Sequence, residues 1–132
     1  MTFYYLATVY TSHPRGQHEA YREACIQSGL LLDARIPTFS PVIYSHPMAI
    51  AAELDPLDHD MWMSLCRPFI QFSHGLIMCK MDCWEQSKGM KEEHETFLQA
   101  GKPIFWMEPE TIPPELLAPR GRGTIDKDIL AL

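Results

Sequence analysis

The segment from residue 75 to residue 107, GLIMCKMDCWEQSKGMKEEHETFLQAGKPIFWM, decides the fold. It begins with the continuous apolar run GLIMCK, which is typical of a strand buried on both faces. It ends with KPIFWM, another run of strand length, and the charged stretch between the two runs predicts a helix from Ser87 to Ala100. A strand, a helix and a second strand at this spacing indicate a βαβ unit, in which the two strands are parallel.

Segments nearer the N-terminus extend the same pattern. Residues 3–10, FYYLATVY, predict a first strand, and residues 17–32 predict a helix because their apolar side chains recur at helical spacing. The proline-bracketed stretch 37–47 is expected to form a short strand, and residues 57–72 a helix that Pro68 kinks or splits. We therefore expect an α/β fold of the flavodoxin-like, Rossmann-like kind, with three α/β/α layers around a mostly parallel sheet of four to five strands.

Composition limits both the organisation and the partners of the chain. Its 132 residues, 46% hydrophobic and 21% charged, predict one domain that spans residues 1–132. A net charge of -6 without a Lys/Arg cluster argues against nucleic acid as a partner. No basic region precedes the first apolar run, and no run approaches the ~20 residues of a membrane span, so a cytoplasmic protein without a membrane partner is expected. The four cysteines lack paired spacing, which predicts buried thiols, no metal site and no cofactor.

Ligands of parallel α/β sheets bind beyond the carboxyl ends of the strands. Three stretches are expected to converge there, namely residues 5–11, 40–47 and 82–93. His46 is expected on the loop after the second strand, where it either bonds a base or sugar or packs against the next proline. Trp84 is expected just after the 75–80 strand, where it either stacks on a base or covers the core.

The start of the helix at residue 88 carries the residues of chemical interest. Ser87 is the expected N-cap, and Gly89 leaves backbone N–H groups open to an approaching anion. A helix N-terminus stabilises an ionised carboxylate, so Glu93 would be charged at neutral pH and able to attack an electrophilic carbon. In the alternative interpretation, Ser87 only caps the helix and the neighbouring lysine–glutamate pairs are exposed to solvent.

Several motifs occur in one order along the chain: YYLATVYT, SPVIYSHP, LDHDMW followed by RPFIQF, and the long segment that ends in KPIFW. In this order the chain resembles the nucleoside 2-deoxyribosyltransferase superfamily, and most closely a bacterial and phage branch whose function is largely unassigned. The resemblance covers about residues 1–110 and leaves the tail, residues 111–132, unassigned.

The most specific element is a serine or aspartate, then a glycine, then a glutamate six positions after the first residue, followed by a helix that ends in GKP. Ser87, Gly89, Glu93 and residues 101–103 match it. The resemblance implies that Glu93 attacks the anomeric carbon and displaces the base, giving a glycosyl-enzyme ester that water or a second base resolves. It also places Tyr5 beside this carboxylate, whereas the alternative is that Tyr5 only fills the core.

The residue at position 87 bears on the substrate, which is expected to be a small-molecule nucleotide or nucleoside. Family members that act on free nucleosides tend to have aspartate there, whereas nucleoside 5′-monophosphate N-glycosidases have serine. A serine hydroxyl beside helix N–H groups can donate to phosphate, so Ser87 favours a monophosphate. His13 and Arg15 on the first loop are further candidates for the phosphate, unless they are simply exposed.

The chain departs from the family pattern in two places. Cys66, in LCRPF, stands where the family usually has an aspartate, for which Asp58 or Asp60 would have to substitute at the substrate. The deoxyribosyltransferases complete their site with an asparagine from a neighbouring subunit, and this sequence contains no asparagine. Three functions follow: cleavage of a nucleoside 5′-monophosphate, base exchange between nucleosides, and a nucleotide-binding module that has lost turnover.

Relatives also build their sites at subunit contacts. Met61, Trp62, Met63 and Phe69 give the helical region around residues 57–72 more apolar surface than one face of a small sheet requires. We expect a homodimer through these helices.

Overall fold

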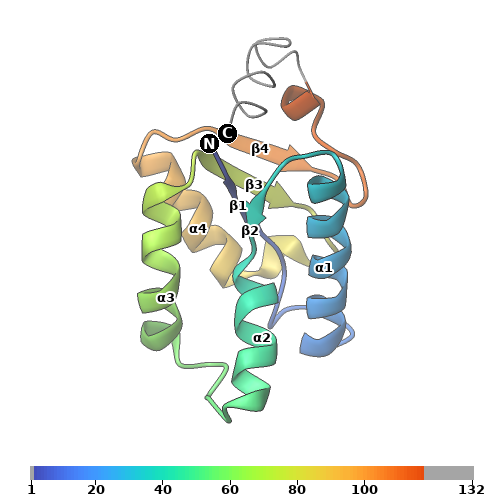
Figure 1. The fold of residues 1–132 in the computed structure, drawn as a ribbon. Coiled ribbons are helices and arrows are strands. Elements are labelled where there is room, and N and C mark those ends of the chain that lie inside the picture. Colours follow the sequence, from blue (N-terminus) through green and yellow to red (C-terminus); the bar gives the residue numbers. More distant parts are fainter. Residues whose placement is uncertain (1, 118–132) are drawn as a thin grey trace, which may run out of the picture.

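The computed structural model describes residues 2–117, which form an α/β fold around a parallel sheet (Figure 1). The strands are β1 (Tyr4–Ala7), β2 (Thr38–Phe39), β3 (Gly75–Cys79) and β4 (Ile104–Met107). They pair in the order β2-β1-β3-β4, and every pairing is parallel. This architecture confirms the fold class expected from the sequence and is consistent with a flavodoxin-like arrangement of three layers.

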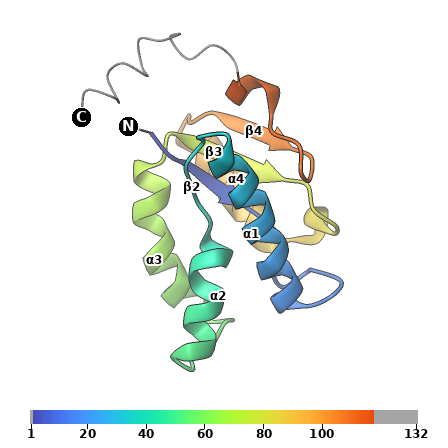
Figure 2. The same cartoon turned by 45° about the vertical axis from the view of Figure 1, so that its right-hand side comes forward.

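Helices cover both faces of the sheet. They are α1 (Gln17–Asp33), α2 (Pro41–Ala51), α3 (His59–Phe72) and α4 (Lys88–Gln99), with single 3-10 turns η1 (Trp84–Gln86) and η2 (Pro114–Leu117). In Figures 1 and 2, α1 lies to the right of the strands and α3 to the left, and Figure 1 shows α4 on the same side as α3. Helix α2 begins directly after the carboxyl end of β2, so it borders the end of the sheet at which ligands of this fold bind.

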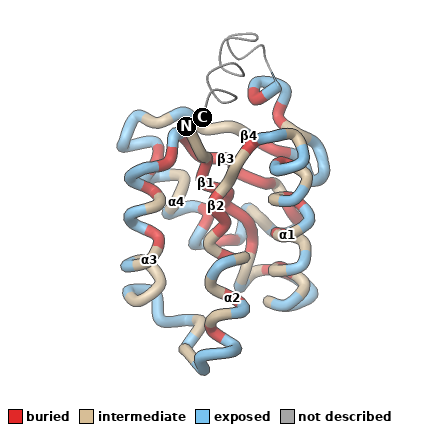
Figure 3. The backbone as a smooth tube through the Cα atoms, viewed as in Figure 1, coloured by how far each residue is buried: buried red, intermediate tan, exposed pale blue. Residues whose placement is uncertain are grey.

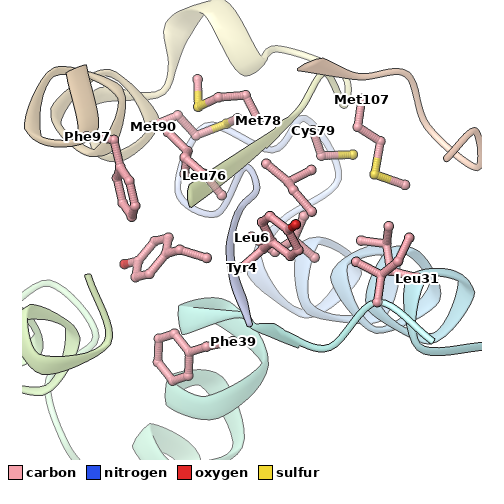
Figure 4. Close-up of a cluster of buried hydrophobic side chains, with 14 of the residues drawn as sticks. Tyr4, Leu6, Leu31, Phe39, Leu76, Met78, Cys79, Met90, Phe97 and Met107 are labelled. Carbon is pink, nitrogen blue, oxygen red and sulfur yellow. The ribbon is translucent and has the colours of Figure 1, made fainter. Parts of the chain in front are cut away.

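The central strands form the core. Every residue of β1 and β3 is buried, whereas the edge strand β4 exposes Trp106 (Figure 3). Figure 4 shows Phe97 and Met90 from α4 on one side of these strands and Leu31 from α1 on the other. A strand covered on both faces has apolar residues at successive positions, which is why the sequence GLIMC predicted a buried strand.

The short strand expected within residues 37–47 is confirmed only at Thr38–Phe39, and from Ser40 onward the expectation is wrong. Strand β2 has only two residues, and the chain turns at Ser40 into helix α2. The Ser40 side chain accepts a hydrogen bond from the Ile43 backbone N–H at 3.3 Å, and Pro41 occupies the first turn, where its fixed φ favours a helix and its missing N–H costs nothing. The Ser-Pro pair was therefore a helix start. Pro68 lies inside α3, which runs on as a single helix.

The GKP segment after α4 has a structural role. Gly101 has φ of +68°, which favours glycine, and its N–H bonds the Leu98 carbonyl while the Lys102 N–H bonds the Phe97 carbonyl. These two bonds form a Schellman motif that ends the helix. The next residue, Pro103, packs against Gly75 so closely that a Cβ on Gly75 would lie 2.6 Å from the Pro103 oxygen. The segment therefore fixes the end of α4 against the start of β3.

Lys102 joins this junction to the neighbouring helix. Its ammonium group donates hydrogen bonds to the carbonyls of Ile70 at 2.7 Å and Ser73 at 2.8 Å, and also to Gln71. These carbonyls lie at the C-terminal end of α3, where backbone acceptors lack partners within the helix and a cation is favourable. Lys102 thus couples the end of α3 to the end of α4.

We predict that Lys102→Met lowers the free energy of unfolding by about 1–3 kcal/mol, because charge-assisted hydrogen bonds to the α3 carbonyls are lost. Urea unfolding followed by circular dichroism measures the change. Lys91→Met, which removes an exposed lysine from α4, is the matched control and should change stability little. Equal stabilities for the two variants would show that Lys102 does not hold the helices together.

Candidate active site

A cavity of about 630 Å³ opens beyond the carboxyl end of β1. Its lining comes from β1 and the following loop, helix α2, residues 56–57, one face of α3, and α4 with its N-cap. These segments are far apart in the sequence, and the parallel sheet brings them together. The volume falls within the range of roughly 300–1,000 Å³ that is usual for small-molecule sites.

Residues predicted from the sequence meet in this cavity. Tyr5, Ser87, Gly89 and Glu93 all line it, and so does Cys66. Tyr5 comes from β1, Cys66 from α3 and the other three from the start of α4. The cavity therefore combines a carboxyl, a phenol, a thiol and an open helix N-terminus.

Glu93 is a half-buried carboxyl whose pKa is raised to about 8. Removal of its carboxyl from water is the main cause, and the Tyr5 hydroxyl partly offsets it by hydrogen bonding to the ionised form. The expectation that Glu93 is charged at neutral pH is thus wrong for the ligand-free protein. Since Glu93 lies in the second turn of α4, the favourable effect of the helix N-terminus has largely decayed there and desolvation dominates.

Tyr5 serves both the core and the cavity, so the two interpretations of this residue are compatible. Its ring packs at a tilt between Phe39 and Phe97, with centroids 5.6 and 5.4 Å away. Burial and the nearby Glu93 carboxyl hold the pKa of its hydroxyl far above the usual range, so it remains a proton donor. Burial also raises the pKa of the Cys66 thiol beside it. Cys66 is therefore neutral and cannot supply the negative charge of an aspartate.

The N-terminus of α4 presents donors to the cavity. The Ser87 oxygen accepts a hydrogen bond from the Met90 N–H at 3.2 Å, which confirms the predicted cap and leaves the hydroxyl hydrogen able to donate elsewhere. Gly89 is exposed, and a Cβ added there would meet only the Ser87 Oγ, at 4.0 Å. Thr8 also lines the cavity, and its hydroxyl is buried without a partner among residues 2–117. Helix N–H groups and an unpaired hydroxyl favour an anionic or strongly polar ligand.

Three other residues that the sequence predicted for the site do not line this cavity, namely Asp60, Trp84 and His46. Asp60 is exposed at the start of α3 and does not line the cavity. Trp84 belongs to η1 and packs edge-on against Trp106 with ring centroids 5.7 Å apart, beside a separate cavity of about 500 Å³. His46 lies within α2, not on a loop, because the expected strand there is a helix. It is buried and does not itself line the cavity.

The charged candidates near the first loop are also engaged elsewhere. His13 is buried and bonds the Glu23 carboxylate at 2.9 Å, and Arg15 pairs with the same carboxylate. Neither lines the cavity, so they do not form a phosphate site there. Asp58 caps α3 by accepting a hydrogen bond from the Met61 N–H at 3.2 Å.

A family model described as "Domain of unknown function (DUF1937)" matches residues 2–109. The chain belongs to this family. The matched region contains the whole sheet and every residue that lines the cavity. No curated protein matches the chain closely enough to count as a relative. Residues 2–117 of this DUF1937 member contain no helix of sufficient length and apolarity to cross a membrane, and no cluster of three or more potential metal-binding side chains.

Sequence reasoning missed several residues of the site in this DUF1937 domain. Trp62 and Tyr10 line the cavity, and the Trp62 indole N–H donates to the Asp55 carbonyl at 2.9 Å. Glu92 is exposed, lines the cavity and pairs with His59 at 3.3 Å. Tyr10 lies within the stretch 5–11 that was expected at the ligand-binding end of the sheet, although the residue itself was not singled out.

We predict a pH-dependent effect of Glu93→Gln on stability. The folded protein retains a proton on Glu93 that the unfolded chain releases, because the pKa is raised from 4.5 to about 8. The contribution of Glu93 to wild-type stability should therefore fall as pH rises from about 4.5 to about 8 and then level off. Glu93→Gln has no ionisable group at position 93 and does not show this decrease. The melting temperature of the variant minus that of the wild type should therefore increase between about pH 4.5 and about pH 8. Glu95→Gln, an exposed carboxylate of α4 that does not line the cavity, is the control, and a pH-independent difference for Glu93→Gln would refute the raised pKa.

Proposed function

We propose that this domain cleaves the N-glycosidic bond of a nucleoside 5′-monophosphate, with Glu93 as the nucleophile. The observation that carries this proposal is the meeting of the Glu93 carboxyl, the Tyr5 hydroxyl and the N-terminus of α4 in one cavity of nucleotide size. The motif of Ser87, Gly89 and Glu93, through which the chain resembles the nucleoside 2-deoxyribosyltransferase superfamily, agrees with this arrangement.

In the proposed reaction, ionised Glu93 attacks the anomeric carbon of the sugar. The carbon–nitrogen bond breaks, its electron pair leaves with the base, and the base takes up a proton from the solvent, which the water that later resolves the ester returns. A water molecule then attacks the glycosyl ester, which releases the sugar phosphate and restores the Glu93 carboxylate. The Tyr5 hydroxyl supports the first step because hydrogen bonding to the carboxylate lowers its pKa.

The phosphate is assigned to the start of α4. The Ser87 hydroxyl and the backbone N–H groups near Gly89 can donate to its oxygens, and Lys88 also lines the cavity. In the described part of the chain, Lys88 and His59 are the lining side chains able to carry positive charge. Recognition of the anion therefore depends mainly on hydrogen-bond donors.

A second candidate function is a nucleotide-binding module without turnover. Two observations favour it, namely the neutral Cys66 thiol in place of an aspartate and the raised pKa of Glu93, which reduces the ionised fraction at neutral pH. Base exchange, the third function considered from the sequence, differs from hydrolysis only in the group that attacks the ester. Adding a second free base to the reaction distinguishes these two.

The homodimer expected from the α3 side chains stays a prediction. Phe69 stacks on Phe39 with ring centroids 3.8 Å apart, and Trp62 and Met63 line the cavity. These three side chains are therefore engaged within the chain. Phe72, at the end of the same helix, is 73% exposed and is the better candidate for a contact between subunits.

The proposal predicts that the purified protein releases free base from at least one nucleoside 5′-monophosphate. A panel of ribo- and deoxyribonucleoside monophosphates, followed by chromatography of the released base, measures the activity. Glu93→Gln should lower turnover by about a hundredfold or more, because it removes the nucleophile and keeps the shape. Glu92→Gln, one residue earlier on α4, should retain activity. Near-normal turnover by Glu93→Gln would refute the assignment, and no release from any substrate would favour the binding module.

Ser87→Asp should reverse the preference between phosphorylated and free nucleosides. The wild type should gain more thermal stability from monophosphates than from the matching nucleosides, because ligands stabilise the native state according to affinity. An aspartate at position 87 can still cap α4. Its negative charge repels a phosphate, whereas its carboxylate oxygens accept a hydrogen bond from the 5′-hydroxyl of a free nucleoside. Melting curves with matched ligand pairs test this. Equal protection by both ligand classes in the wild type would argue against a phosphate site at Ser87.

A further inference from the structure

Tyr10 lines the same cavity as the α4 residues to which the chemistry is assigned. It follows β1, is half-buried, and lines the cavity together with residues of α2 and α3. Its hydroxyl lies 2.8 Å from Nδ1 of His46, which is a hydrogen bond between the loop after β1 and helix α2. The phenol is thus held in one orientation at a surface that a ligand would contact.

The environment of His46 shows what fixes this orientation. The imidazole is 6% exposed and packs against the rings of Tyr21 and His18 from α1, with centroids 4.9 and 5.6 Å away. The Nε2 atom of His46 has no hydrogen-bond partner among the described residues. Within residues 2–117, the ring therefore makes one hydrogen bond, from Nδ1 to the Tyr10 hydroxyl. Because the His46 ring is buried and makes this one polar contact, the hydrogen bond strongly restricts the orientation of the Tyr10 hydroxyl.

The ring is also neutral, which decides the direction of the bond. Burial, and to a smaller extent His18, lower the pKa of His46. A neutral imidazole accepts through one nitrogen, and a phenol O–H is a better donor than an imidazole N–H. We assign Tyr10 as the donor to Nδ1, which leaves the phenol oxygen free to accept a hydrogen bond from the cavity.

We propose that Tyr10 contacts the base of the bound nucleotide and that His46 is a positioning residue that orients the Tyr10 hydroxyl. The proposal rests on the function proposed above, because the sugar and phosphate are assigned to Glu93 and the start of α4. The remaining wall, formed by α2 and α3, carries apolar side chains such as Val42 and Trp62 that suit a planar ring. The Tyr10 oxygen adds an acceptor for a base N–H.

Binding measured by calorimetry tests the proposal without requiring turnover. The probe is whichever nucleoside 5′-monophosphate of the panel binds the wild type most tightly. Tyr10→Phe keeps the ring and should weaken binding by about tenfold, the usual scale for loss of one neutral hydrogen bond in a site. Tyr44→Phe is the matched control, because Tyr44 is exposed on α2 and does not line the cavity.

His46 is tested through its dependence on Tyr10. His46→Leu should weaken binding, and the double variant with Tyr10→Phe should bind no more weakly than Tyr10→Phe alone, because His46 acts through the same hydroxyl. His46→Asn places an amide atom near the position of Nδ1 and should restore most of the affinity. Additive losses in the double variant, or no rescue by asparagine, would reduce His46 to a packing residue and overturn the positioning role.

The outcomes separate this inference from the proposed function. Wild-type affinity in Tyr10→Phe, together with base release by the wild type, overturns the inference and leaves the function standing. Weakened binding in Tyr10→Phe without base release from any substrate supports the contact and refutes the hydrolase. Failure of every monophosphate to bind the wild type overturns both.

Discussion

The desolvation of one carboxyl group determines what this cavity can do. Glu93 stands where α4 meets the end of the sheet, and burial raises its pKa to about 8. The Tyr5 hydroxyl is the principal group that opposes this effect. A carboxyl held in this way is mostly protonated at neutral pH. Any ligand that donates hydrogen bonds to the carboxylate would favour its ionised form, so binding and activation would be coupled.

The position of that carboxyl depends on contacts at the far end of α4. Gly101 ends the helix, Pro103 packs against Gly75, and Lys102 binds the last carbonyls of α3. The two helices that carry Glu93 and Cys66 are therefore fixed relative to each other at their C-terminal ends. The GKP motif, noted in the sequence for its resemblance to a family of enzymes, has this physical explanation. Its occurrence indicates how α4 is positioned and says nothing of catalysis by itself.

The sequence predicted elements whose signals were local and strong. The buried run of β3 and the Ser87 cap of α4 were recognised because an apolar run and a capping serine carry their own physical signal. Helix α2 was mistaken for a strand, because its apolar composition resembles that of a strand and the Ser-Pro start was overlooked. This error also placed His46 on a loop, where it appeared free to bind a ligand.

The site was predicted less completely than the fold, because its properties depend on tertiary contacts. The sequence indicated that Tyr5, Ser87 and Glu93 would meet, and the cavity brings them together. It could not indicate the raised pKa of Glu93, because burial of a helical carboxyl depends on what packs against it. Trp84 packs on Trp106 beside another cavity, and only the structure shows that partner.

The central claim is that Glu93 forms a covalent bond with the sugar. Intact-protein mass spectrometry with a 2′-deoxy-2′-fluoro nucleoside 5′-monophosphate tests it directly, because the fluorine slows hydrolysis of the ester and allows it to accumulate. The account predicts one added fluorinated sugar-phosphate on the wild type, located on the peptide that contains Glu93, and no adduct on Glu93→Gln. Release of base by the wild type without any adduct, or an adduct that persists in Glu93→Gln, would contradict the account.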